Sequence, residues 1–152
     1  MKTALLLLVL AVLLREGATR LVPFPEPVPS PHPNLAPDAV VRIVTESLQH
    51  VNSPRPNAGI YAAYQFASPA NKQVTGPYGR FLTLVKHEAF STLLRPGFAE
   101  FGPLVVAGQE ARQLITIRPP HAPAERFQFE LSRQAGGPWA DCWMVDGVIP
   151  AP

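Results

Sequence analysis

Six side chains are candidates for the lining of a ligand-binding site, because their polar groups could orient a small molecule. They are Tyr61, Tyr64, Asn71, Thr75, Tyr78 and Asp146. Tyr61 and Tyr64 lie three residues apart in a segment with a helical pattern, so they share one face of that helix. In the last apolar segment, alternation places Cys142, Met144, Asp146 and Val148 on one face of a strand. An inward-facing Asp146 would then lie among apolar groups, where a carboxylate could accept a proton.

Each candidate also has a purely structural interpretation. The tyrosines could be core aromatics whose hydroxyls are satisfied by partners. Asn71 and Thr75 could cap helix ends at an ordered corner instead of forming one wall of a pocket. Asp146-Gly147 has the composition of a turn or a β-bulge near the end of a strand. These alternatives stay open on the sequence alone.

The sequence lacks the motifs of several well-defined enzyme and metal sites. The histidines His32, His50, His87 and His121 are scattered, and no pair has the spacing of a helical zinc site. There is no phosphate-binding glycine loop and no Gly-x-Ser-x-Gly nucleophile elbow. We therefore assign no catalytic residue and expect no metal or cofactor.

The candidate polar groups are concentrated in the connection from Phe66 to Phe81. Ser68-Pro69 and Thr75-Gly76-Pro77 both have the composition of a helix start, because a hydroxyl can accept from first-turn amides and proline tolerates the first turn. We therefore expect a helix to open after each pair, and Gly76 to adopt a backbone angle that suits glycine.

Helices are predicted from about 38 to 51, 59 to 67 and 77 to 86, followed by a short apolar turn over 90–94. In the first helix, apolar residues recur every three or four positions, with Asp38 as the expected cap. Asn57 is the expected cap of the second helix. His87 follows the third helix, where we expect it to interact with the helix carbonyls.

Four strands are predicted after the helices, over 98–107, 111–118, 126–134 and 139–149, with a hairpin turn over 134–138. Alternation is clearest where Phe127, Phe129 and Leu131 interleave with polar residues. Helices followed by antiparallel strands predict an α+β domain, in which the N-terminal helices pack on one face of a curved antiparallel sheet. Such an arrangement tends to enclose a cavity.

Composition and the N-terminal region indicate an exported protein. The 152-residue chain has a net charge of +2 and no cluster of Lys or Arg, so we do not expect nucleic-acid binding. Residues 1–20 combine a short charged start with an apolar run, as in a signal peptide, and a retained membrane anchor is the alternative. Residues 21–37 are a proline-rich linker before a single domain over 38–150. The lone Cys142 is expected to be buried.

Several short motifs together resemble a family of small bacterial and plant proteins that carry a domain of unknown function. The motifs are Gly59-Ile60, Phe66-Ala67-Ser68-Pro69, Asn71, Thr75-Gly76-Pro77, Arg80-Phe81, Leu131-Ser132-Arg133-Gln134 and Cys142-Trp143-Met144. The resemblance covers about residues 38–150 and implies a cone similar to nuclear transport factor 2 and to cystatin. It brings no catalytic or binding residue.

Two functions follow as hypotheses. The first is an exported, non-enzymatic domain, in the periplasm, outside the cell or in a lumen, that binds a small apolar ligand or a protein partner. A homodimer through the outer sheet face would be typical of the cone. The alternative is a cavity enzyme similar to ketosteroid isomerase, with Asp146 or His87 as base and a Tyr hydroxyl as electrophile. The alternative requires such a pair within hydrogen-bond reach.

Overall fold

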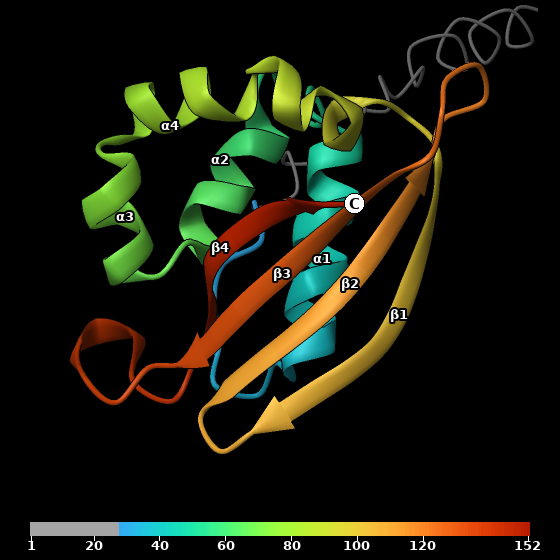
Figure 1. The fold of residues 1–152 in the computed structure, drawn as a ribbon. Helices are drawn as coiled ribbons and strands as arrows, with labels where there is room; N and C mark the ends of the chain where they lie inside the picture. The colour runs from blue at the N-terminus through green and yellow to red at the C-terminus, as the bar shows by residue number, and fades with distance from the viewer. Residues whose placement is uncertain (1–27) are drawn as a thin grey trace, which may run out of the picture.

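The computed structural model describes residues 28–152, which form helices followed by one antiparallel sheet (Figure 1). The helices are α1 (Pro37–Gln49), α2 (Ala58–Phe66), α3 (Pro69–Thr75), α4 (Tyr78–Val85) and the 3-10 helix η1 (Glu88–Leu94). The strands are β1 (Phe98–Ala107), β2 (Glu110–Arg118), β3 (Glu125–Arg133) and β4 (Trp143–Ala151), with the short 3-10 helix η2 (Gly137–Trp139) before β4. The predicted α+β class, with helices packed on a curved sheet, is confirmed. The predicted signal segment lies outside the described residues.

Helix α1 forms because its apolar residues occupy one face, of which Val40, Val41, Val44 and Leu48 are buried. Its cap differs from the prediction. Ala36 holds the cap position and Pro37 the first helical position, where a missing N–H costs nothing. Asp38 lies in the first turn, so its expected role as cap is wrong, although its charge still suits the helix N-terminus.

Helix α2 begins after Asn57, as predicted, but the Asn57 side chain makes no capping hydrogen bond. Its backbone is in the left-handed region (φ 60°), and its N–H donates to Oδ1 of Asn52 at 3.0 Å. Within α2, Gly59 allows close packing against α1. A Cβ built on Gly59 would lie 1.9 Å from the carbonyl oxygen of Ser47.

Helix α3 opens after Ser68, whose Oγ accepts from the backbone N–H of Asn71 at 3.1 Å, as predicted. The second predicted start has a different structure. Thr75 is the last residue of α3, and its Oγ1 donates back to the carbonyl oxygen of Asn71 at 3.0 Å. Thr75 therefore does not cap α4. Gly76 ends α3 with a positive φ of 81°, and Pro77 precedes α4.

The sheet has the strand order β1-β2-β3-β4, with every pair antiparallel, so β1 and β4 are its edges. Ile115 and Ile117 of β2 and Phe127, Phe129 and Leu131 of β3 are buried on the face toward the helices. Figure 1 shows the helices on that side of the sheet, with α1 behind the strands and α2 to α4 grouped beside β4.

The connection between β3 and β4 is longer than predicted. It covers residues 134–142 and contains η2, so the last strand begins at Trp143 and not at Trp139. The N–H of Gln134 donates to the carbonyl oxygen of Cys142, and the N–H of Asp141 donates to that of Gln134, both at 2.9 Å. Gly137 has a positive φ, as a tight turn demands.

Part of the proline-rich segment packs on the domain. Pro31 is buried, and Leu35 contacts the hydrophobic core. The described part of the predicted linker is thus attached to the domain from about Pro31 onward. None of the helices formed by residues 28–152 has the length and apolarity needed to cross a lipid bilayer.

Candidate functional site

An apolar groove lies between the helices and the edge strand β4. Its volume is about 470 Å³, and all but three of the described residues that line it are apolar or glycine. The lining comes from α1 to α4, η1 and β4, and includes Leu48, Val74, Leu84, Phe90 and Val148. Val74 is 79% exposed and Leu84 is 40% exposed. The groove therefore presents apolar surface to solvent.

Contacts between α3 and β4 form one wall of this groove. The carbonyl oxygen of Val145 accepts from the backbone N–H of Ser68 at 2.9 Å and from Nδ2 of Asn71 at 3.0 Å. Ala67 also forms an isolated parallel bridge with Val145. Since β4 is an edge strand, its carbonyl at Val145 would otherwise lack a protein partner on that side. The start of α3 is thereby fixed to the sheet.

Three of the six predicted site residues, Asn71, Thr75 and Asp146, line the groove and are the only polar side chains that residues 28–152 contribute to it. Asn71 and Thr75 lie one turn apart on α3. Asp146 reaches the same groove from β4. The structure therefore brings together residues up to 75 positions apart in sequence, where the first turn of α3 is hydrogen-bonded to β4 next to Asp146.

Asp146 lies at a β-bulge. Leu131 pairs with Val145 and Glu130 pairs with Gly147, so Asp146 is an extra residue between two paired positions. The bulge confirms the structural interpretation of Asp146-Gly147. It also shifts the alternation by one residue, since Met144 pairs with Ser132 but Val148 pairs with Phe129 on the other face. The prediction that Cys142, Met144, Asp146 and Val148 share one face is therefore wrong.

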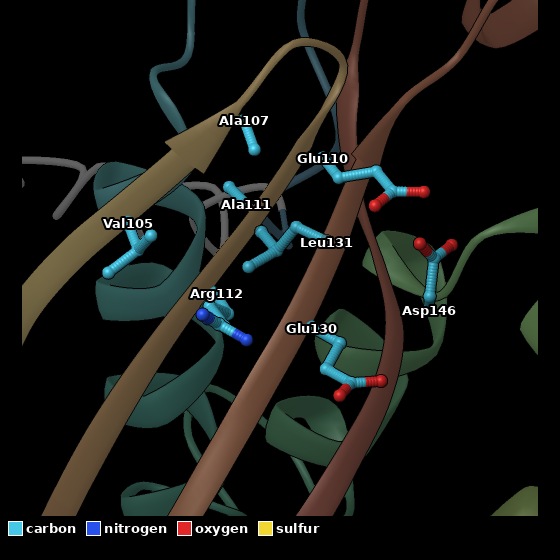
Figure 2. A pocket seen from close by; sticks show the side chains of 8 residues that line it. All are labelled: Val105, Ala107, Glu110, Ala111, Arg112, Glu130, Leu131 and Asp146. Carbon is cyan, nitrogen blue, oxygen red and sulfur yellow. The ribbon is translucent and has the colours of Figure 1, made fainter.

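The Asp146 carboxylate also borders a second hollow, of about 360 Å³, on the face of the sheet away from the helices (Figure 2). Figure 2 shows Glu110, Glu130 and Asp146 on three neighbouring strands, with Arg112 beside them. Oδ1 of Asp146 accepts from Oγ of Ser132 at 2.9 Å. Within residues 28–152, no group of three or more His, Cys, Asp or Glu side chains is arranged to hold a metal ion.

The three tyrosines among the predicted site residues lie outside the groove and form an aromatic cluster with Phe81. The ring centroids of Tyr61 and Tyr78 are 5.3 Å apart, those of Tyr64 and Tyr78 are 5.4 Å apart, and those of Tyr64 and Phe81 are 5.3 Å apart. These distances are typical of stabilising aromatic pairs. Tyr61 is 37% exposed, whereas Tyr64 and Tyr78 are half-buried against the hydrophobic core. Phe81 belongs to that core and also lines the groove, so the cluster touches the groove through Phe81 and not through a tyrosine.

The pKa values of two groups are shifted here: the hydroxyl of Tyr78, in the aromatic cluster, and the amine of Lys72, which packs on it. Partial burial raises the pKa of the Tyr78 hydroxyl, with a smaller contribution from Tyr61. The hydroxyl donates to the carbonyl oxygen of Asn57 at 3.5 Å. Nζ of Lys72 lies 4.7 Å from the centroid of the Tyr64 ring, and burial lowers the pKa of this amine. These contacts fix α3 and α4 against α2.

His87 caps a helix instead of serving the groove. The backbone N–H of Ala89 donates to Nδ1 of His87 at 3.3 Å, at the start of η1. The expected interaction of the His87 side chain with the carbonyls of the preceding helix is therefore wrong. His87 is exposed and is absent from the groove lining.

Sequence reasoning missed the apolar residues that make most of the groove, among them Ala70, Val74, Leu84 and Val148. An exposed valine in a short polar helix was the one local signal, because Val74 lies in Pro69–Thr75, where no residue is buried. The other residues follow ordinary core patterns. Comparisons of the chain with protein-family models, with curated proteins and with solved structures found no significant match.

Proposed function

We propose that this protein is a non-enzymatic binding domain that holds a small apolar molecule in the groove between α3, α4, η1 and β4. The observation that carries the proposal is the groove itself, at about 470 Å³ and almost entirely apolar. Ligand sites typically measure about 300 to 1,000 Å³ and combine apolar walls with a few polar groups. The groove has this size and this composition.

Exposure of the lining gives a second argument. Val74 and Leu84 present apolar surface to water in the free protein, which costs about 25 cal/mol for each Å² that a ligand could cover. A ligand that covers these side chains removes the cost. Solvent-exposed apolar surface on a rigid wall is therefore a source of binding free energy.

The enzyme alternative has less support. No hydrogen bond among residues 28–152 joins a Tyr hydroxyl to Asp146 or to His87, and the hydroxyl of Tyr78 donates to a backbone carbonyl. Asp146 is hydrogen-bonded to Ser132 instead. The base and electrophile that proton transfer requires are therefore not paired in this arrangement.

The test is saturable binding of the neutral apolar dye Nile red, followed by its fluorescence. Ala70 is exposed and lines the groove, so Ala70→Phe should fill the groove without disturbing the core. We expect this variant to bind at least about tenfold more weakly, equivalent to about 1.4 kcal/mol.

Ala89→Phe is the matched control, because Ala89 is exposed on the neighbouring helix η1 but does not line the groove. This variant should bind the dye as the wild type does. Equal affinity of Ala70→Phe and wild type, or equal loss in both variants, would contradict the assignment of the ligand to this groove.

A further inference from the structure

The polar side chains among the described lining of the apolar groove lie where α3 meets β4, because Asn71 bonds to Val145, next to Asp146, and Thr75 bonds to Asn71. They offer mainly hydrogen-bond acceptors. The hydroxyl proton of Thr75 is donated to the carbonyl oxygen of Asn71, and Nδ2 of Asn71 donates to the carbonyl oxygen of Val145. Among the hydrogen bonds made by residues 28–152, none occupies Oδ1 of Asn71 or Oδ2 of Asp146. Both of these oxygens are therefore free to accept a hydrogen bond from a ligand.

The charge that the described residues bring to the groove is negative. Asp146 is the one charged residue among them, and no Lys, Arg or His of residues 28–152 lines the groove. Behind Asp146, on the outer face of the sheet, Glu110 and Glu130 add two carboxylates and Arg112 adds one positive charge (Figure 2). A ligand carboxylate would therefore meet like charge, with no cationic side chain among the described lining of the groove to pair with it, which disfavours it.

Asp146 keeps its orientation without using its whole hydrogen-bonding capacity. An ionised carboxylate offers about four lone-pair directions, and Oγ of Ser132 occupies one of them, on Oδ1. The bulge at Asp146 lets this residue border both the groove and the outer hollow. Oδ1 is therefore held by Ser132, and Oδ2 keeps its capacity to accept a hydrogen bond.

We propose that the ligand of the groove is an apolar molecule that ends in a hydrogen-bond donor, with a protonated amine preferred over a hydroxyl and a carboxylate excluded. The apolar body would lie along Val74, Leu84 and Phe90, and the donor would reach Asp146 and Asn71. Asp146 is then the residue that determines specificity. This inference depends on the proposed function, because it names the ligand class of the same groove.

The experiment compares three probes that share one alkyl chain and differ in the head group: decylamine, 1-decanol and decanoate. Each probe displaces Nile red from the protein at pH 7, below the concentration at which it forms micelles. Because a hydrogen bond to a charged group is worth roughly two to three times a neutral one, we expect decylamine to bind about tenfold more tightly than decanoate, with 1-decanol between them.

Asp146→Asn removes the charge but keeps an acceptor for Ser132. In this variant the affinities of decylamine and decanoate should differ by no more than about twofold, and the affinity of 1-decanol should change little. Asp146→Glu restores the charge and should restore the preference for the amine. The melting temperature of each variant shows whether it is folded.

Glu130→Gln is the control, because Glu130 borders the outer hollow but does not line the groove. This variant should keep the preference of the wild type. Equal binding of all three probes by the wild type, or tighter binding of decanoate, would overturn the inference and leave the proposed function standing. The same loss of preference in Glu130→Gln and Asp146→Asn would also overturn it. Failure of all three probes and of Nile red to bind would overturn both proposals.

Discussion

The Asn71 side chain donates a hydrogen bond from Nδ2 to the carbonyl oxygen of Val145 at 3.0 Å, across 74 positions of sequence. This bond joins the first turn of α3 to the edge strand of the sheet. The N–H of Ser68 donates to the same oxygen, so two donors from one helix start satisfy one carbonyl. The position of α3, and with it one wall of the groove, follows from this pair of contacts.

Replacing Asn71 with Ala should lower the free energy of unfolding by about 1 kcal/mol, the usual worth of one such hydrogen bond. The better helix propensity of alanine offsets part of the loss. Urea denaturation measures the change. Gln73→Ala is the control, because Gln73 is exposed on the same helix and its replacement should have little effect. Equal destabilisation by the two replacements would show that the bond to Val145 contributes nothing specific.

Replacing Gly76 with Ala should destabilise the protein by about 1 to 3 kcal/mol, because a φ of 81° with a ψ of −167° is a backbone conformation that residues with a Cβ rarely adopt. Gly76 has φ of +81°, and a Cβ there would lie 2.9 Å from Cδ of Arg80. Gly76→Val should be more destabilising still, since valine is β-branched. Thermal unfolding gives the measurement, and an unchanged melting temperature would refute the requirement for glycine.

Gly79→Ala is the matched control for Gly76. Gly79 is the second residue of α4, and a Cβ there would meet no atom within 4 Å. Alanine is favoured over glycine in a helix by up to about 1 kcal/mol, the value for a helix interior. We therefore expect the melting temperature to rise in Gly79→Ala and to fall in Gly76→Ala, although both variants make the same chemical change.

Replacing Gly59 with Ala should be strongly destabilising, although alanine is the better helix former. The added Cβ would lie 1.9 Å from the carbonyl oxygen of Ser47 and 2.9 Å from Cα of Val51, so α1 and α2 would have to separate. Forced shifts of this kind cost about 1 to 3 kcal/mol, and occasionally more. The loss of unfolding free energy in Gly59→Ala is measured by circular dichroism during urea denaturation. A variant as stable as wild type would mean that α1 and α2 pack less closely than described.

The thiol of Cys142 should make stability fall at alkaline pH. Its side chain is buried, with 3% exposed, and burial raises its pKa, with a smaller contribution from Asp141. A raised pKa in the folded state means that the unfolded chain loses the proton first. This contribution to stability is therefore fully present below the ordinary thiol pKa and is lost as pH rises through the folded value.

Unfolding free energies of the wild type and of Cys142→Ala, measured between about pH 7 and 10, isolate this effect, because that range spans the ordinary thiol pKa of about 8.5. The difference in unfolding free energy between the two proteins should be constant near pH 7. As the pH rises, the unfolding free energy of the wild type should fall relative to that of Cys142→Ala. Comparison with the variant removes the contributions of other groups that titrate in this range. A difference in unfolding free energy that stays constant with pH would contradict the raised pKa of Cys142.

Local sequence patterns predicted the class and order of the elements because the patterns reflect short-range rules. The apolar face of α1, the alternation of Phe127, Phe129 and Leu131, and the cap at Ser68 are each encoded within a few residues. Two of the predicted helix caps were wrong. Helix α1 begins one residue earlier than predicted, with Pro37 at its first position, so Asp38 lies inside the first turn. The Thr75 hydroxyl donates to the carbonyl oxygen of Asn71 within α3 instead of capping α4.

The amino-acid sequence by itself determined that this chain forms helices followed by antiparallel strands, that glycine suits position 76, and that Asn71, Thr75 and Asp146 are candidates for the lining of a site. Only the tertiary structure decided which candidates meet. One bulged residue in β4 changed which of its side chains share a face, and the tyrosines of α2 and α4 pack on one another outside the groove lining. The groove depends on contacts such as Asn71 to Val145, which join distant segments and leave no local periodicity in the sequence.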